Sequence, residues 1–153
     1  MFIFCALSGS VASAQALPEA NVQLTLSAQE SPWEPGPRTI AVGIYYPEGR
    51  RDAITPGTGL FLTLHNWGGT GATGTADPEV LAARYNVVAI TVDYYQSGKF
   101  DTEGPLPYDF GWLQALDALR ALHFVYEGLS QANVPFHKGR IYATGGSGGG
   151  NVS

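Results

Sequence analysis

The run GGSGG at residues 145–149 constrains this chain more than any other feature, because it directly follows the apolar segment RIYAT at residues 140–144. A strand that leads into G-x-S-x-G predicts a nucleophile elbow, in which the serine stands at the tip of a sharp turn. Glycines are needed around Ser147 because so tight a turn leaves no room for side chains. A flexible Gly/Ser linker is the alternative interpretation, but the adjoining strand favours the elbow.

A serine nucleophile also requires a base to accept its proton. In chains with this kind of elbow, the acid and the histidine follow the serine in sequence. No Asp, Glu or His follows Ser147 here, and the histidines at 65, 123 and 137 all precede it. We therefore expect residues 17–153 to be the amino-terminal part of a larger catalytic domain. On its own this part is expected to be inactive.

Composition indicates a folded domain and excludes several classes of function. Hydrophobic residues make up 44% of the chain and charged residues 14%, which is typical of a globular protein rather than a disordered one. The net charge of -5 and the lack of a basic cluster argue against nucleic-acid binding. The only cysteine is Cys5, so neither disulfides nor thiolate metal sites are expected after it. No pattern of metal ligands is present, and no cofactor is predicted.

The first 16 residues resemble a signal peptide. Residues 1–11 are mostly apolar, and Ala14-Gln15-Ala16 matches an A-x-A cleavage site that would leave Leu17 as the mature start. The positively charged n-region is missing, because no Lys or Arg precedes Arg38. An ordinary apolar strand is the alternative. The segment is too short to span a bilayer, so the sequence predicts a secreted or periplasmic protein without a membrane span.

Two strands are expected to open the domain, followed by alternating helices and strands. The predicted strands are residues 22–29, 39–46, 60–64, 87–92 and 140–144, and the first two are expected to form an antiparallel pair. The predicted helices are residues 77–85, with Asp77 as the cap, and 109–129. Polar residues in the second helix recur at helical spacing and predict one solvated stripe: Gln114, Asp117, Arg120, His123 and Glu127. This order predicts an α/β fold with a mostly parallel sheet and flanking helices.

Two segments resemble the α/β-hydrolase superfamily, and in particular secreted esterases and prolyl-oligopeptidase-like serine hydrolases. Residues 138–149, KGRIYATGGSGG, resemble the family's turn, strand and elbow. Residues 62–69, LTLHNWGG, resemble the His-Gly-x loop after the third strand, although Asn66 stands where glycine is usual. The resemblance implies an α/β-hydrolase-type fold that stops just after the elbow. It also implies hydrolysis of an ester or amide bond in a small molecule or a polymer.

The resemblance assigns roles to residues in both segments. Ser147 would be the catalytic nucleophile, and the backbone amide of Gly148 would be one donor of the oxyanion hole. The second donor would be the amide of Trp67, with Asn66 or Gly68 as alternatives; losing one such donor typically costs about 3 kcal/mol. The Trp67 indole would either wall the acyl pocket or simply pack. The supporting positions are His65, Gly68 and Gly69 in the loop, and Gly145 and Gly149 in the elbow.

Two other functions stay open. Residues 69–74, with glycines at Gly69, Gly71 and Gly74, match G-x-G-x-x-G, and Asp93 lies 19 residues further on, as in an NAD(P)-binding oxidoreductase. Residues 65–68 separate this motif from its strand, and the predicted helix begins only after it, both of which count against a dinucleotide. The other alternative is a catalytically silent binding protein on the hydrolase fold. The loop after residue 93 includes Tyr94, Tyr95, Asp101 and Glu103, which are candidates to line the site entrance.

Overall fold

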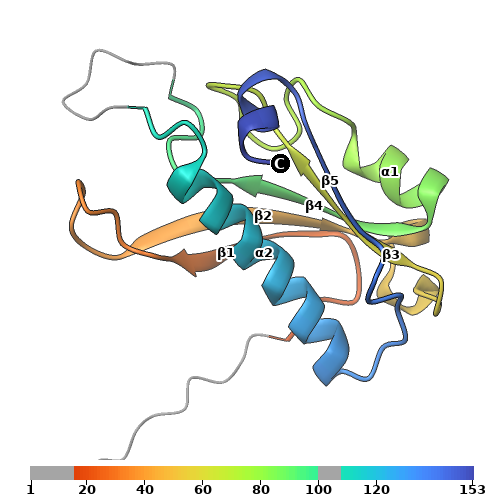
Figure 1. The fold of residues 1–153 in the computed structure, drawn as a ribbon. Coiled ribbons are helices and arrows are strands. Elements are labelled where there is room, and N and C mark those ends of the chain that lie inside the picture. Colours follow the sequence, from red (N-terminus) through yellow and green to blue (C-terminus); the bar gives the residue numbers. More distant parts are fainter. Residues whose placement is uncertain (1–15, 100–107) are drawn as a thin grey trace, which may run out of the picture.

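The computed structural model describes residues 16–99 and 108–153 (Figure 1). Residues 1–15, with Cys5 and nearly all of the predicted signal peptide, lie outside the described residues. The described chain forms a mixed α/β domain. Its main elements are β1 (Val22–Ala28), β2 (Arg38–Tyr45), β3 (Gly59–Leu64), α1 (Pro78–Tyr85), β4 (Val87–Asp93), α2 (Trp112–Gln131) and β5 (Ile141–Gly145). Short 3-10 turns are η1 (Pro47–Gly49), η2 (Arg51–Ala53) and η3 (Ser147–Asn151).

The five strands form one sheet in the order β1-β2-β4-β3-β5. The predicted antiparallel pairing of β1 with β2 is confirmed, and β2 is also antiparallel to β4. Strand β3 runs parallel to both β4 and β5. The carboxyl ends of β3, β4 and β5 therefore meet at one edge of the sheet, which is where open α/β sheets place their ligands.

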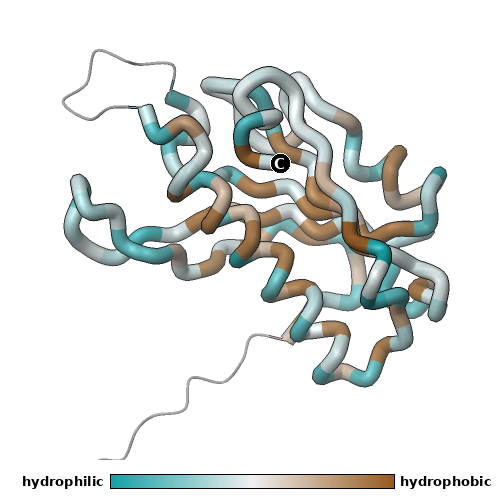
Figure 2. Tube along the Cα trace, viewed as in Figure 1, coloured by the Kyte–Doolittle hydropathy of each residue, from teal (hydrophilic) through white to brown (hydrophobic). Residues whose placement is uncertain are grey.

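The two helices cover opposite faces of the sheet. Side chains of a strand alternate between its faces, and in β4 Val88 and Ile90 belong to the larger core beneath α2. Val87 and Ala89 point the other way and pack with Leu81 of α1. Burial on both faces explains the continuous apolar runs of the central strands, which appear as brown segments in Figure 2.

Helix α1 begins as the sequence predicts. The Asp77 carboxylate accepts hydrogen bonds from the backbone N–H groups of Glu79 (2.8 Å) and Val80 (3.1 Å), and Pro78 occupies the first turn. These bonds satisfy donors that a helix leaves unpaired at its start. The helix ends at Asn86, which adopts a left-handed conformation.

The solvated stripe predicted along α2 is wrong at its first two positions. Gln114 and Asp117 are buried beneath the helix, with exposed fractions of 1% and 0%. Arg38 donates to Asp117 Oδ2 at 2.7 Å, and the Tyr95 N–H donates to the same oxygen at 2.9 Å. Gln114 Nε2 donates to the Tyr95 carbonyl at 3.2 Å. These two side chains have protein partners in place of water, so helical polarity alone did not reveal which face is buried.

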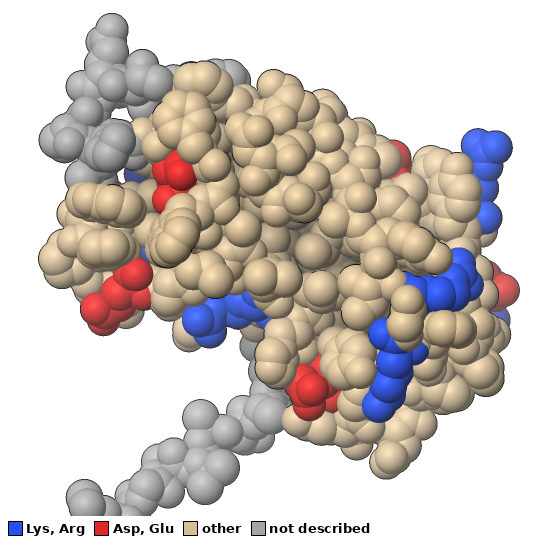
Figure 3. Space-filling model, in the orientation of Figure 1, with Lys and Arg blue, Asp and Glu red and all other residues tan. Residues whose placement is uncertain are grey.

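The outer face of the molecule around α2 is largely uncharged. Large apolar side chains are exposed along the helix beside the predicted polar residues Arg120 and His123: Trp112, Leu116 and Leu119. Figure 3 shows few charged side chains over the centre of this face. Strand β5 lies beside it and pairs, among the described strands, with β3 alone. Ile141 and Tyr142 of β5 are correspondingly exposed.

Candidate active site

Ser147 lies just beyond β5, at the first position of η3, and is exposed. Its φ of 50° is in the left-handed region, which side chains other than glycine rarely adopt. Holding a serine there costs on the order of 1–3 kcal/mol, so the surrounding structure must enforce it. A strand, a strained exposed serine and a helical turn are the backbone geometry that the elbow hypothesis requires.

The glycines of this turn are in backbone contact with the loop that follows β3. A Cβ atom on Gly146 would collide with the carbonyl oxygen of Gly74, and one on Gly149 would collide with the carbonyl oxygens of Leu64 and His65. Only glycine therefore fits at these two positions. The contacts fix the serine turn against the residues that leave the carboxyl end of β3.

Two backbone amides beside Ser147 have no hydrogen-bond partner in the part of the chain that the structure describes. A Cβ atom placed on Gly148 would lie 3.0 Å from the backbone nitrogen of Trp67, so the two segments adjoin there. Within the described residues neither the Gly148 N–H nor the Trp67 N–H donates a hydrogen bond. Two such donors next to an exposed hydroxyl fit the stabilisation of an oxyanion.

The backbone of Asn66 is used within its own loop. Its N–H donates to the Thr73 carbonyl at 2.9 Å, and its carbonyl accepts from the Gly69 N–H at 3.0 Å. The Gly68 N–H, like that of Trp67, makes no hydrogen bond among the described residues. Of the candidate second donors, Trp67 is the one whose nitrogen adjoins Gly148, whereas the Asn66 amide is already paired.

His65 is buried and holds this loop in place. Its Nδ1 lies 2.7 Å from the Asn66 carbonyl oxygen and its Nε2 lies 2.7 Å from Ser97 Oγ. Because a carbonyl only accepts, Nδ1 carries the proton and Nε2 accepts from the Ser97 hydroxyl. The ring stacks on Tyr94 at a centroid distance of 4.0 Å. Burial lowers the pKa of His65, against smaller opposing effects of its Asn66 bond and of Asp93, which keeps the ring neutral.

Residues that follow β4 clamp the same loop. The Gly71 N–H donates to Asp93 Oδ1 at 2.6 Å. The Tyr94 hydroxyl donates to the His65 carbonyl at 2.5 Å. The Gly98 N–H donates to the Gly69 carbonyl at 2.9 Å. The loop is thereby preorganised, which is what an oxyanion donor requires.

The same bonds disfavour a dinucleotide in the G-x-G-x-x-G loop. Asp93, the residue that would bind a ribose, is bonded to Gly71 inside the loop itself. The first N–H groups of α1, which would hold a phosphate, are occupied by the Asp77 carboxylate. A phosphate would have to displace a like-charged group from that helix end.

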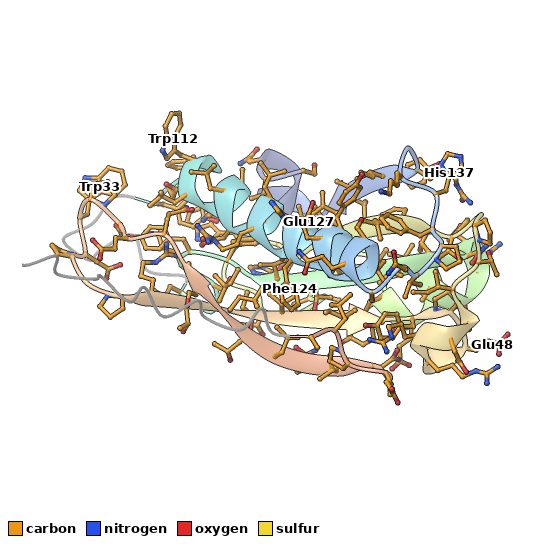
Figure 4. All side chains as sticks on the ribbon, turned by 90° about the horizontal axis from the view of Figure 1, so that it is seen from below. Trp33, Glu48, Trp112, Phe124, Glu127 and His137 are labelled. Atoms are coloured by element: carbon orange, nitrogen blue, oxygen red, sulfur yellow. The ribbon has the colours of Figure 1, made fainter. Side chains whose placement is uncertain are left out.

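The remaining candidates lie away from this chemistry or outside the described residues. His123 is an exposed residue of α2, and the His137 ring, in the turn before β5, accepts a hydrogen bond from the Gly139 N–H at 3.3 Å (Figure 4). Tyr94 and Tyr95 are buried, with exposed fractions of 3% and 4%, so they do not line an entrance. Asp101 and Glu103 lie outside the described residues.

Two aromatic residues of the site were missed by the sequence analysis. Tyr108 packs on Trp67 with ring centroids 4.8 Å apart, and Phe110 meets Tyr108 edge-on at 5.0 Å. The signal that could have found them is the Tyr-Asp-Phe sequence just ahead of α2, where an apolar pair has no helix or strand to bury it. Ser97, the partner of His65, carries no recognisable signal in its sequence.

No family model and no curated protein matches this chain. Among the described residues, no helix has the length and hydropathy needed to cross a membrane. In the same part of the chain, no group of three His, Cys, Asp or Glu side chains is placed to hold a metal ion. The geometry around Ser147 is therefore the basis on which a function is assigned.

Proposed function

We propose that this chain carries the nucleophile and the oxyanion hole of a serine hydrolase of the α/β-hydrolase type, acting on an ester or amide bond. The observation that carries the proposal is the exposed, left-handed Ser147 next to the N–H groups of Gly148 and Trp67, which donate no hydrogen bond within residues 16–99 and 108–153. A linker serine would need neither the strained backbone nor the crowded glycines.

The proposed reaction starts with attack of Ser147 Oγ on the substrate carbonyl carbon, while a base takes the hydroxyl proton. The carbonyl oxygen becomes an oxyanion that accepts hydrogen bonds from Gly148 and Trp67. Collapse of this intermediate breaks the bond to the alcohol or amine, which leaves with the proton from the base. Water then attacks the acyl-serine by the same route, releasing the acid and restoring Ser147.

The base and the acid that orients it are proposed to lie outside residues 1–153. Among the histidines here, His65 is buried and bonded through both ring nitrogens. His123 and His137 belong to α2 and to the turn before β5. The chain order of serine, acid and histidine in this type of fold agrees with that placement.

A fluorophosphonate probe tests this proposal on the protein expressed from the complete reading frame that contains this chain. The probe is expected to modify Ser147, and the Ser147→Ala variant is expected to remain unlabelled. Ser153→Ala is the matched control, since Ser153 is an exposed serine near the same end of the sheet. Labelling that persists in Ser147→Ala would contradict the proposal. A folded wild type that never reacts would support the silent binding protein instead.

A further inference from the structure

Three aromatic side chains from separate parts of the sequence meet beside the serine turn. Trp67 follows β3, whereas Tyr108 and Phe110 precede α2. The Trp67 and Tyr108 rings lie 4.8 Å apart with a 31° tilt, and the Phe110 ring stands at 85° to Tyr108 at 5.0 Å. The second pair has the edge-to-face arrangement that aromatic rings prefer, and the first pair is tilted. We refer to these three residues as the aromatic cluster.

Trp67 of the aromatic cluster, and Gly111 next to Phe110, adjoin the serine turn at two separate points. A Cβ atom on Gly148 would lie 3.1 Å from the Cβ of Trp67. A Cβ atom on Gly111, next to Phe110, would lie 2.6 Å from the carbonyl oxygen of Asn151 at the end of η3. The cluster therefore spans the turn that carries Ser147.

The aromatic cluster contributes little to the core of the domain. Trp67 is 37% exposed and Phe110 is 66% exposed. Exposed single apolar residues are ordinary, but adjoining aromatic rings next to a reactive group indicate a binding surface.

The charged side chains around the aromatic cluster indicate which kind of ligand it can bind. Four other aromatic rings in the described chain carry an Arg or Lys within about 6 Å: Tyr85, Tyr95, Tyr126 and Tyr142. None of the three rings of the aromatic cluster has such a cation among the described residues. Asp109, between Tyr108 and Phe110 in sequence, supplies no positive charge either, and its carboxylate accepts a hydrogen bond from the Gln114 N–H at 3.0 Å. The surface therefore suits a neutral, flat, apolar group.

From these observations we infer that the aromatic cluster binds an aromatic ring of the substrate, so that the substrates are neutral esters or amides carrying an aryl group near the scissile carbonyl. The inference rests on the proposed function, because it takes Ser147 as the reacting group. Stacking on Trp67 and edge contact with Phe110 would hold the ring while Ser147 attacks.

Hydrolysis of two esters matched in size tests the inference in the complete protein. Ethyl 3-phenylpropanoate and ethyl 3-cyclohexylpropanoate differ in that only the phenyl ring has a flat π-face that can stack on an indole or meet another ring edge-on. We expect kcat/KM, measured by proton release, to favour the phenyl ester about tenfold. In Phe110→Ala the ratio is expected to fall towards one. In Trp112→Ala, which removes a solvent-pointing tryptophan of α2 (Figure 4), the ratio is expected to stay at the wild-type value.

A binding measurement separates the subsite from the catalytic proposal. In the Ser147→Ala protein, ligand-observed NMR is expected to show saturation transfer to the phenyl protons of 3-phenylpropanamide. The transfer should fall several-fold when Phe110→Ala is added, and persist when Trp112→Ala is added instead. Hydrolysis without a phenyl preference would overturn the subsite and leave the hydrolase standing. Binding that depends on Phe110, in a protein that hydrolyses neither ester, would support the subsite and overturn the hydrolase. Stronger saturation transfer to a methyl glucoside than to the amide would show that the cluster prefers a sugar to an aryl group, and would overturn the inference.

Discussion

The carboxylate of Asp93 accepts a hydrogen bond from the backbone N–H of Gly71 at 2.6 Å, and so ties the end of β4 to the loop that follows β3. That loop carries Trp67, the proposed second oxyanion donor. A residue that sequence spacing offered as a ribose ligand is thus bonded to the loop itself.

Asp93→Ala is expected to lower the proposed hydrolytic turnover, measured on the protein expressed from the complete reading frame, about tenfold, because the loop loses a charge-assisted bond. Binding of NAD or NADP, measured by calorimetry, is expected to be undetectable in both the wild type and the Asp93→Ala variant. Asp52→Ala, at an exposed carboxylate of η2, is the control and should behave as wild type. Micromolar cofactor binding that disappears in Asp93→Ala would favour the oxidoreductase alternative.

Trp67→Pro removes one backbone N–H without removing the loop. We expect a loss of turnover of about a hundredfold or more, since one donor of the oxyanion hole disappears. Trp67→Phe keeps the N–H and an aromatic ring, so it should retain most of the activity. Circular dichroism checks that both variants fold. Wild-type turnover in a folded Trp67→Pro protein would exclude Trp67 as a donor.

His65 makes the stability of the domain depend on pH. Burial lowers its pKa in the folded state below the ordinary histidine value of 6.5, so the unfolded state binds the proton more readily. The contribution of His65 is therefore complete above about pH 6.5 and is lost as the pH falls below it. Asp93, the nearest charged group acting on the ring, opposes this shift without reversing it. Urea unfolding at about pH 7.5 and about pH 5.5 should show a smaller pH dependence in His65→Gln. His123→Gln, on the exposed side of α2, should leave the pH dependence unchanged.

The ion pair between Arg38 and Asp117 is almost fully buried, with side-chain exposures of 13% and 0%. Asp117→Ala leaves the guanidinium without its partner and is expected to lower the free energy of unfolding by about 3 kcal/mol or more. Replacing both residues, as Arg38→Met with Asp117→Leu, should restore much of the loss because no unpaired charge remains. Arg120→Ala, on the exposed face of α2, should change the free energy of unfolding by less than about 0.5 kcal/mol. Equal losses in the single and double variants would show that packing, and not the pair, matters.

Strand β5 is an open edge of the described sheet, and open edges promote association. Ile141→Lys is expected to raise the monomeric fraction of the 153-residue chain in sedimentation velocity, because a charge there opposes edge pairing. Val80→Lys places the same charge on α1, away from the edge, and should have little effect. If both variants or neither behave differently from wild type, edge pairing is not the cause of association.

Local signals were sufficient to predict most elements of the fold. Asp77 and Pro78 mark the start of α1, and continuous apolar runs mark β3 and β4, because each signal acts within a few neighbouring residues. The burial of Asp117 could not be predicted in this way. Its partner, Arg38, lies 79 positions away, and helical periodicity contains no information about such a distant residue.

In the candidate site, too, local sequence predicts some features, and others depend on contacts between distant residues. The serine turn is visible in sequence because the glycines and the strand adjoin it. The approach of Trp67 to Gly148, and of Tyr108 to Trp67, depends on how β3, β5 and α2 are placed in the sheet. Such contacts are set by topology, so the sequence suggested Trp67 as a donor and was silent on Tyr108.

The strand order has a consequence for synthesis of the chain on the ribosome. Strands β1 and β2 are neighbours in both sequence and sheet, so they can pair as soon as they emerge. Among the described strands, β3 pairs with β4 and β5 alone, and both of these are made after it. The apolar segment GLFLTL must therefore wait unpaired until residue 87 and beyond have left the exit tunnel. During that interval the nascent chain exposes an apolar strand that is later buried inside the sheet, and it is then most in need of a chaperone.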